Sequence, residues 1–316
     1  MTARFPLYKA TLTSMLFVIM LAGEQFVIAA SQQTQQDGEL RDIIKDWKQK
    51  RPGSQSSTKK PPVYTVKTRI PKEKDLLGSA GDAEIGVTIW RYRRAKAGDE
   101  VRDLVQPKDD GVKEEWAMER VEAETMLSDN QKVRLTIESL RTGYLYVINR
   151  AKYADGTYGD SYLIFPTKRI RDGENAVRAG RPIQIPGAKD KSPYLELIPR
   201  RATSGAWEVS EELILLITQE PIEEFDPEVD RMSLDQEKVE HLKQRYGAPV
   251  ERSEMKGGAG LAITKSEDSA RKNPLQLLAA DDPYPQTIYR VAAKPGDPLL
   301  VVLELKVQAV TERSGR

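Results

Sequence analysis

The sequence contains no cysteine and only one histidine among its 316 residues. The absence of cysteine excludes disulfides, thiol nucleophiles, thiolate metal ligands and a lipid-modified cysteine at an export cleavage site. A structural zinc site built from the usual histidine and cysteine ligands is excluded as well. We therefore expect no metal and no cofactor, and a hydrophobic core has to supply the stability.

The single histidine, His241, lies in a predicted helix among charged and polar neighbours. A Ser-His-acid triad would need this imidazole beside an activated serine, and the sequence has no G-x-S-x-G turn to present one. We interpret His241 as a solvated surface side chain. No catalytic residue is predicted.

Long hydrophobic runs are also scarce, and only Ala10–Gly23 is both long and largely apolar. It follows the basic residues Arg4 and Lys9 and precedes the small-residue stretch Val27–Ala30, an order typical of a secretory signal peptide over residues 1–30. Polar residues interrupt the run, so a retained anchor, which needs a span of about 20 residues, is the less favoured alternative. We expect an exported protein, periplasmic or extracellular, with no transmembrane segment after cleavage.

The chain also lacks an excess of charge of one sign, because 49 Lys and Arg residues balance 48 Asp and Glu residues. The net charge is +1, and cleavage after residue 30 would remove Arg4, Lys9 and Glu24 and leave a net charge of 0. A dedicated nucleic-acid-binding protein has a strong basic excess. The balance therefore predicts no nucleic-acid partner.

Residues 31–80 are rich in Ser, Gln, Thr, Lys and Pro and are predicted to form a flexible leader. One short apolar segment interrupts this leader. Its spacing is that of an apolar stripe on a short amphipathic helix, formed by Leu40, Ile43, Ile44 and Trp47. Such a helix either docks on the protein's own surface or contacts another envelope component. Docking is favoured because so short a helix needs packing to persist.

Residues 81–316 are predicted to form a β-rich domain, and the clearest strands lie between Val133 and Pro166. The first strand alternates Val133, Leu135 and Ile137 with polar residues, as a half-buried strand does. The second, Tyr144–Ile148, is apolar on both faces, so we expect it to be central and covered on both sides. The third, Ser161–Phe165, ends at Pro166. We expect the three to form the central sheet.

Further strands are predicted before and after this segment. A strand begins near Ile85 (IGVTIWRYR), and Glu114–Glu124 reads as either a short helix or an extended edge. Glu212–Thr218 (ELILLIT) is short, partly β-branched and soon ended by Pro221, which favours a core strand. Shorter candidates are Pro182–Ile185, Tyr194–Ile198 and Trp207–Val209.

The C-terminal part is predicted to hold one helix and one hairpin. Ser233 and Gln236 have the spacing of a capping box, and Gly247 is a natural stop for a helix over 233–247. Thr287–Ala292 and Leu299–Val307 are expected to pair as a hairpin. The fold class is all-β: a sandwich or barrel-like β domain with one C-terminal helix and a flexible N-terminal leader.

The loop Tyr153–Asp160 is the best candidate ligand site, because Asp155 and Asp160 could offer oxygens to a calcium ion. The loop lacks the spacing of an EF-hand, and Asp-Gly and Gly-Asp are also what a plain hairpin needs, so turn chemistry is favoured. Paired carboxylates such as Glu211 and Glu212 are interpreted as solvated faces. A hydrolase would require two acids that converge only in three dimensions.

A family likeness is carried by five parts of the sequence: IGVTIWRYR, VRLTIES with GYLYVINR, YADGTYGDSYLIFPT, ENAVRAGRPIQIP and LILLIT. Together they resemble the bacterial proteins grouped as domain of unknown function 4384. The resemblance covers about Ile85 to Pro221 and implies an accessory or binding role without catalytic residues to carry over. We therefore expect an exported, non-enzymatic module that binds an envelope protein or cell-wall glycan.

Overall fold

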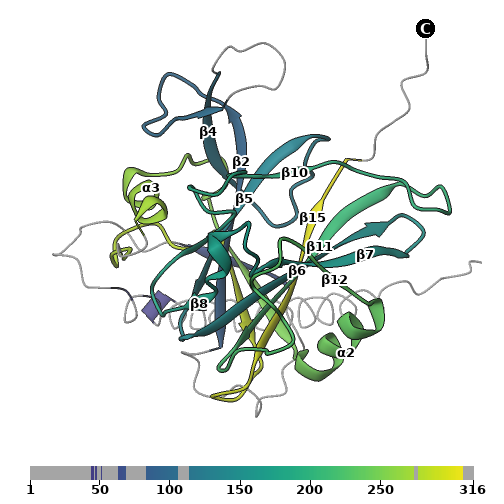
Figure 1. The fold of residues 1–316 in the computed structure, drawn as a ribbon. Helices are drawn as coiled ribbons and strands as arrows, with labels where there is room; N and C mark the ends of the chain where they lie inside the picture. Colours follow the sequence, from purple (N-terminus) through teal and green to yellow (C-terminus); the bar gives the residue numbers. More distant parts are fainter. Residues whose placement is uncertain are drawn as a thin grey trace, which may run out of the picture. The chain divides into compact units, whose positions relative to one another are not determined.

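The computed structural model describes residues 44, 45, 47, 51, 63–68, 83–105, 114–273 and 277–308. In this part of the chain nine strands form one sheet and six form another, and the strands of each sheet pair in antiparallel fashion. The two sheets share one apolar interior. Figure 1 shows the strands of both sheets. The predicted all-β fold is confirmed in its sandwich form.

In the described part of the chain, no helix is long and apolar enough to cross a membrane. The nine-stranded sheet contains β1 to β5, β9, β10, β13 and β14, and the six-stranded sheet contains the other strands. The bounds are β1 Tyr64–Thr68, β2 Glu84–Arg94, β3 Asp103–Val105, β4 Glu114–Val121, β5 Gln131–Ser139, β6 Gly143–Tyr153, β7 Tyr158–Phe165, the 3-10 turn η2 Arg171–Gly173, β8 Ala176–Val177, β9 Ile183–Ile185, β10 Leu195–Leu197, β11 Glu208–Thr218, β12 Met232–Leu234, α2 Gln236–Tyr246, β13 Val250–Met255, α3 Lys265–Lys272, β14 Thr287–Val291 and β15 Leu299–Lys306.

The interior between the sheets is built by alternation of side chains along each strand. From the nine-stranded sheet, β5 directs Val133, Leu135 and Ile137 inward, and from the six-stranded sheet β11 directs Leu213 and Leu215 inward. All five side chains are buried. Removing each from water contributes about 1.5–3 kcal/mol, so this interior is the main source of stability.

A second apolar layer covers the outer face of the six-stranded sheet. Ile148 of β6 and Ile214 and Leu216 of β11 point away from the sandwich interior and pack with Val239 and Leu242 of α2. Figure 1 shows α2 beside this sheet. Because β6 lies between β7 and β11 and is covered on both faces, the predicted central position of this strand is confirmed.

The segment between Val133 and Pro166 contains the three predicted strands, but they do not form one sheet. β5 pairs in the nine-stranded sheet, whereas β6 and β7 pair in the six-stranded sheet. The chain crosses between the sheets just before Gly143, where a Cβ atom would lie 2.3 Å from the carbonyl oxygen of Thr218. The close approach of the two backbones requires glycine there.

The predicted C-terminal hairpin is wrong. β14 pairs with β13 and β2, while β15 pairs with β11, so the two strands belong to different sheets. A turn does form at the expected place, where the backbone N–H of Asp297 donates to the carbonyl of Lys294 at 3.0 Å. It carries the chain from one sheet to the other, because the apolar faces of both strands are buried in the same interior.

The predicted helix is present as α2, but its predicted capping box is wrong. Ser233 pairs with Tyr162 in the β12–β7 ladder, and the N-cap is Asp235. The described residues hold a second helix, α3, that the sequence analysis did not include. Its first turn carries a complete capping box between Thr264 and Glu267. The ambiguous segment 114–124 is the extended alternative, β4.

Residues from the predicted leader pack on the outer face of the nine-stranded sheet. Trp47 is fully buried, and its indole N–H donates to Glu84 Oε2 at 2.9 Å. The guanidinium of Arg51 donates to both oxygens of Glu138, at 2.9 and 2.7 Å. A Cβ at Gly86 would lie 2.7 Å from the Trp47 ring, so this glycine leaves room for it. The signal peptide and most of the leader lie outside the described residues and stay predictions.

Substitution of Arg51 by Met should lower the free energy of unfolding by about 3–5 kcal/mol, because it leaves the Glu138 carboxylate buried without its cation. Urea denaturation measures the loss. The double variant R51M/E138M should recover most of it. The matched control is Arg102→Met, which breaks a solvent-exposed pair with Glu115 and should cost at most about 1 kcal/mol. Equal losses for R51M and R102M would contradict the docked position of Arg51.

Candidate functional site

A wide cleft lies along the segment that connects β7 to β10. Its volume is about 1530 Å³, and residues 167–195 supply most of its lining. The segment starts from the six-stranded sheet and passes through β9, which belongs to the nine-stranded sheet, so the cleft has walls from both. Pockets for small molecules are about 300–1,000 Å³, and the larger size favours an extended ligand.

Positively charged side chains dominate the lining of this cleft. Eleven Lys and Arg residues line it, against four Asp and Glu residues, although the whole chain is nearly neutral. A concave surface with one prevailing sign of charge attracts ligands of the opposite sign. The cations are Lys168, Arg169, Arg171, Arg178, Arg181, Lys189, Lys191, Arg200, Arg231, Arg271 and Lys272, and the acids are Asp172, Glu174, Asp190 and Asp230.

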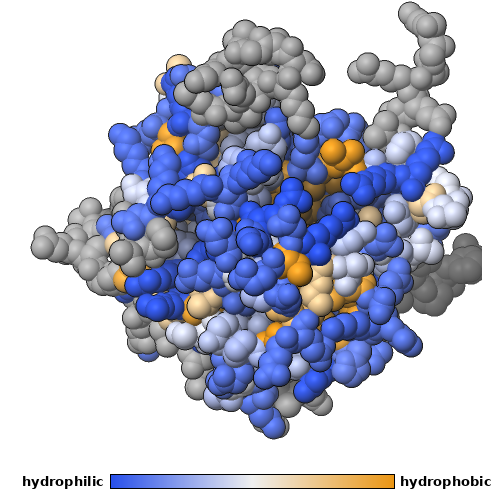
Figure 2. All heavy atoms as spheres, in the orientation of Figure 1, coloured by the Kyte–Doolittle hydropathy of each residue, from blue (hydrophilic) through white to orange (hydrophobic). Residues whose placement is uncertain are grey.

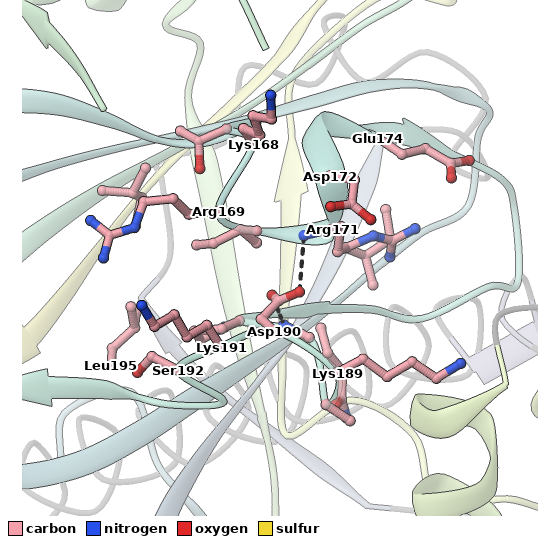
Figure 3. A pocket seen from close by; sticks show the side chains of 18 of the residues that line it. Lys168, Arg169, Arg171, Asp172, Glu174, Lys189, Asp190, Lys191, Ser192 and Leu195 are labelled. Atoms are coloured by element: carbon pink, nitrogen blue, oxygen red, sulfur yellow. Dashed lines mark hydrogen bonds between the residues drawn. The ribbon is translucent and has the colours of Figure 1, made fainter. Parts of the chain in front are cut away.

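Asp190 holds two parts of the cleft wall together. Its carboxylate accepts hydrogen bonds from the backbone N–H groups of Arg171, at 3.1 Å, and Gly187, at 2.6 Å. Figure 3 shows these two bonds, with the side chains of Lys189 and Lys191 leading away on opposite sides of Asp190. Asp190 therefore holds two backbone segments together, and its carboxylate is used in hydrogen bonds to their N–H groups.

The turn η2 holds the backbone beside Asp190 in a strained form. Arg171 and Asp172 have φ angles of 55° and 50°, in the left-handed region that side chains disfavour. The next residue, Gly173, donates its N–H to the carbonyl of Thr167 at 3.1 Å, and a Cβ there would lie 2.9 Å from Pro227. Strain of this kind persists only where neighbouring structure holds it, as at ligand-binding sites.

Several cations of the cleft are free to meet a ligand. Arg169, Arg178, Lys189 and Lys191 are exposed, and none of them forms an ion pair with a residue that the structure describes. Burial lowers the pKa of Arg171, and the nearby carboxylates oppose the shift. The surrounding surface is mostly hydrophilic on the face drawn in Figure 2, with apolar residues in small groups. These features suit a charged ligand.

A carboxyl pair, of which Glu208 is buried and Glu211 half-buried, lies next to the cleft. Glu208 is 1% exposed, and its Oε2 accepts the backbone N–H of Arg200 at 3.1 Å. Glu211 accepts the side-chain amide of Asn149 at 2.7 Å. Burial, together with the neighbouring charge of Glu211, raises the pKa of Glu208 to about 8. At pH 7 this carboxyl is therefore protonated.

An irregularity in β11 brings these two carboxyls together, and no pattern in the sequence predicts the pair. Residues 208 and 211 would face opposite sides of a regular strand. The register against β6 shifts between Glu208 and Ser210, and such a bulge places both glutamates on one side. The adjacent Glu211 and Glu212 are predicted to be solvated, and this is wrong for Glu212, which is buried and paired with Arg150.

The predicted ligand loop lies at the β6–β7 turn and does not line the cleft. Asp155 accepts hydrogen bonds from the N–H and hydroxyl of Thr157, at 3.0 and 2.6 Å, and from the hydroxyl of Ser204, at 2.5 Å. Asp160 accepts one from the hydroxyl of Tyr162 at 3.1 Å. Asp155 is thus used in turn chemistry. Among the described residues no group of three or more His, Cys, Asp or Glu could hold a metal ion.

Stability should fall as the pH rises from about 4.5 to 8, because folded Glu208 keeps its proton with a pKa of about 8 while the unfolded chain loses it near the ordinary value of 4.5. The folded state binds more protons in this window, so the slope is negative, by at most about 1.4 kcal/mol per pH unit. Substitution Glu208→Gln should remove this component in denaturation curves recorded between pH 5 and 8. The exposed Glu196→Gln serves as control and should leave the slope unchanged. Parallel curves for wild type and E208Q would contradict the protonated state.

Comparisons with known proteins leave the family open. No family model matches the chain, and no curated protein matches it either. The resemblance to domain of unknown function 4384 therefore stays a prediction. One solved structure, the crystal structure of the C-terminal domain of Wzt, is 10% identical over 85% of this chain and 89% of that chain, with a TM-score of 0.25. A similarity at that level supports no argument about function.

Proposed function

We propose that this chain is an exported, non-enzymatic binding module of the bacterial cell envelope and that its cationic cleft takes an anionic envelope component. The observation that carries the proposal is the set of eleven cations against four acids in one cleft of a nearly neutral chain. Arg guanidinium groups bind carboxylates and phosphates through paired hydrogen bonds, and Lys adds point charges. An acidic envelope protein and a cell-wall glycan are the two ligand classes.

The predicted signal peptide and leader complete this proposal. Residues 1–30 direct the chain out of the cytoplasm. Trp47, Arg51 and β1 of the leader are packed on the domain, so any reach from a point of attachment comes from the part of the leader before Trp47. The resemblance to domain of unknown function 4384 points the same way, since it implies an accessory role.

A hydrolase is the second candidate, and the pair of Glu208 and Glu211 is the observation that favours it. A carboxyl with a pKa near 8 is suited to act as a general acid. The two groups, however, stand on one strand and interact directly with each other, whereas glycoside hydrolysis needs two carboxyls on either side of the scissile bond. Glu208 is also closed off from solvent. Binding is therefore the better supported function.

Charge reversal in the cleft should weaken the binding of a polyanion. The probe is fluorescently labelled polyacrylate, titrated at low salt into wild type and into the double variant K189E/K191E. Affinity should fall at least about 10-fold in the variant and should weaken for wild type as salt is added, because the attraction is electrostatic. The control K256E/K294E makes the same change in net charge at exposed lysines outside the cleft. Equal losses in both variants would show that the cleft is not the site.

Export is tested by the mature N-terminus. The full chain is produced in a bacterium with two membranes, fractionated, and sequenced from its first residue. The periplasmic protein should begin close to residue 31, after the small-residue stretch Val27–Ala30. Recovery of a chain with Met1 intact in the membrane or cytoplasmic fraction would contradict cleavage and export.

A further inference from the structure

One cation of the cleft is held in place by an aromatic ring. The guanidinium carbon of Arg231 lies 3.4 Å from the ring centroid of Tyr162, and both residues line the cleft. A separation this short requires the planar guanidinium to lie flat on the ring, as a cation–π stack. Arg231 is exposed and Tyr162 is half-buried, so the guanidinium forms the outer layer of the stack.

The pairing of β12 with β7 explains this contact. Ser233 of β12 lies directly opposite Tyr162 of β7, and Arg231 immediately precedes β12. Because side chains alternate along an extended chain, Arg231 lies on the same side of the sheet as Ser233 and diagonally across from Tyr162. The serine opposite the ring is small, so the long side chain of Arg231 has room to cover the ring.

The ring of Tyr162 is itself anchored. Its hydroxyl donates to Asp160 Oδ2 at 3.1 Å, and its backbone lies in β7, between β6 and β12. Asp160, which the sequence suggests as a calcium ligand, thus supports an aromatic ring of the cleft lining. The hydrogen bond and the strand together limit the motion of the surface on which Arg231 rests.

The charge of Arg231 is available to a ligand. Arg231 forms no ion pair with a residue that the structure describes, and neither does its neighbour Asp230, which also lines the cleft. The ring covers one face of the guanidinium, whereas the N–H donors point outward in its plane. An arginine held in this way loses less conformational freedom when it binds than a freely moving one.

A fixed guanidinium edge fits one kind of chemical group. Two of its parallel N–H groups match two oxygens on the same atom, as in a carboxylate or a phosphate. The ammonium group of a lysine is a point charge and lacks this fork. The other cations of the cleft therefore attract an anion, while Arg231 can also fix the orientation of one of its acid groups.

We propose that Arg231, stacked on Tyr162, is the residue of the cleft that binds an oxyanion group of the ligand, a carboxylate or a phosphate, through two parallel hydrogen bonds. Tyr162 is then a positioning residue. The assignment rests on the proposed function and deepens it, because it names the group that the cleft recognises and the residue that recognises it.

The first test is Arg231→Lys, which keeps the charge but removes the fork. Fluorescently labelled polyacrylate and polyphosphate, which supply carboxylates and phosphates, are titrated into wild type and variant. Affinity should fall about 10-fold, as expected for one lost charge-assisted hydrogen bond, and the polymer with the larger loss carries the recognised group. The matched control is Arg245→Lys, whose guanidinium lies 5.1 Å from the Tyr246 ring outside the cleft and which should leave both affinities unchanged.

Salt dependence separates recognition from simple attraction. The slope of log affinity against log salt follows the number of charges that meet the polymer. R231K and Tyr162→Leu keep that number, so they should bind more weakly than wild type with an unchanged slope. Arg231→Met removes a charge, so it should bind more weakly and also flatten the slope.

Each other outcome overturns a distinct claim. Wild-type affinity of R231K for both polymers would reject Arg231 as the oxyanion-binding residue and leave the anion-binding function standing. A loss in R231K together with wild-type affinity in Y162L would reject Tyr162 as its positioning residue. Failure of wild type to bind either polymer would reject the proposed function itself.

Discussion

Apolar side chains on both faces of β6 and β11 are the constraint that organises this molecule. Val147 of β6 and Leu215 of β11 face the sandwich interior, while Ile148 and Ile214 of the same strands face α2. Strands of this kind have to be covered twice. The nine-stranded sheet provides one cover and α2 the other, so the chain must pass repeatedly between layers. The cleft follows one of these passages, from β7 to β9.

The outer face of the nine-stranded sheet carries buried charge beside its apolar cluster, which includes Trp90 and Met118. Glu138 and Arg120 are buried there, and each is matched by a residue from a distant part of the chain, Arg51 and Glu267 respectively. Buried ion pairs add little net stability, because removing two charges from water offsets most of their attraction. Their effect is to permit only one arrangement, since any other would leave a buried charge unmatched.

Periodicity in the sequence was sufficient to find most strands, but it indicated neither their partners nor the cleft. The inward residues of β14 and β15 are apolar whether these strands pair with each other or across the sandwich, so the hairpin was predicted wrongly. Ser233 does not cap the helix as expected, because it pairs with Tyr162 of β7, a residue distant along the chain. The cations of the cleft alternate with acids and prolines along residues 167–195, so no run of like charge marks them. The backbone N–H groups that Asp190 binds are brought to it by the fold, so the sequence does not reveal these bonds. The Glu208 pair depends on a β-bulge, and no glycine in the sequence indicates that bulge.

The cleft has one wall from each sheet, and this has a mechanical consequence. A polymer bound across it would pass any tension into β7 and β9 at the same time, and from there into the apolar interior that joins the sheets. Pulling on the ligand would therefore load the most extensively buried part of the protein, where many side chains share the force.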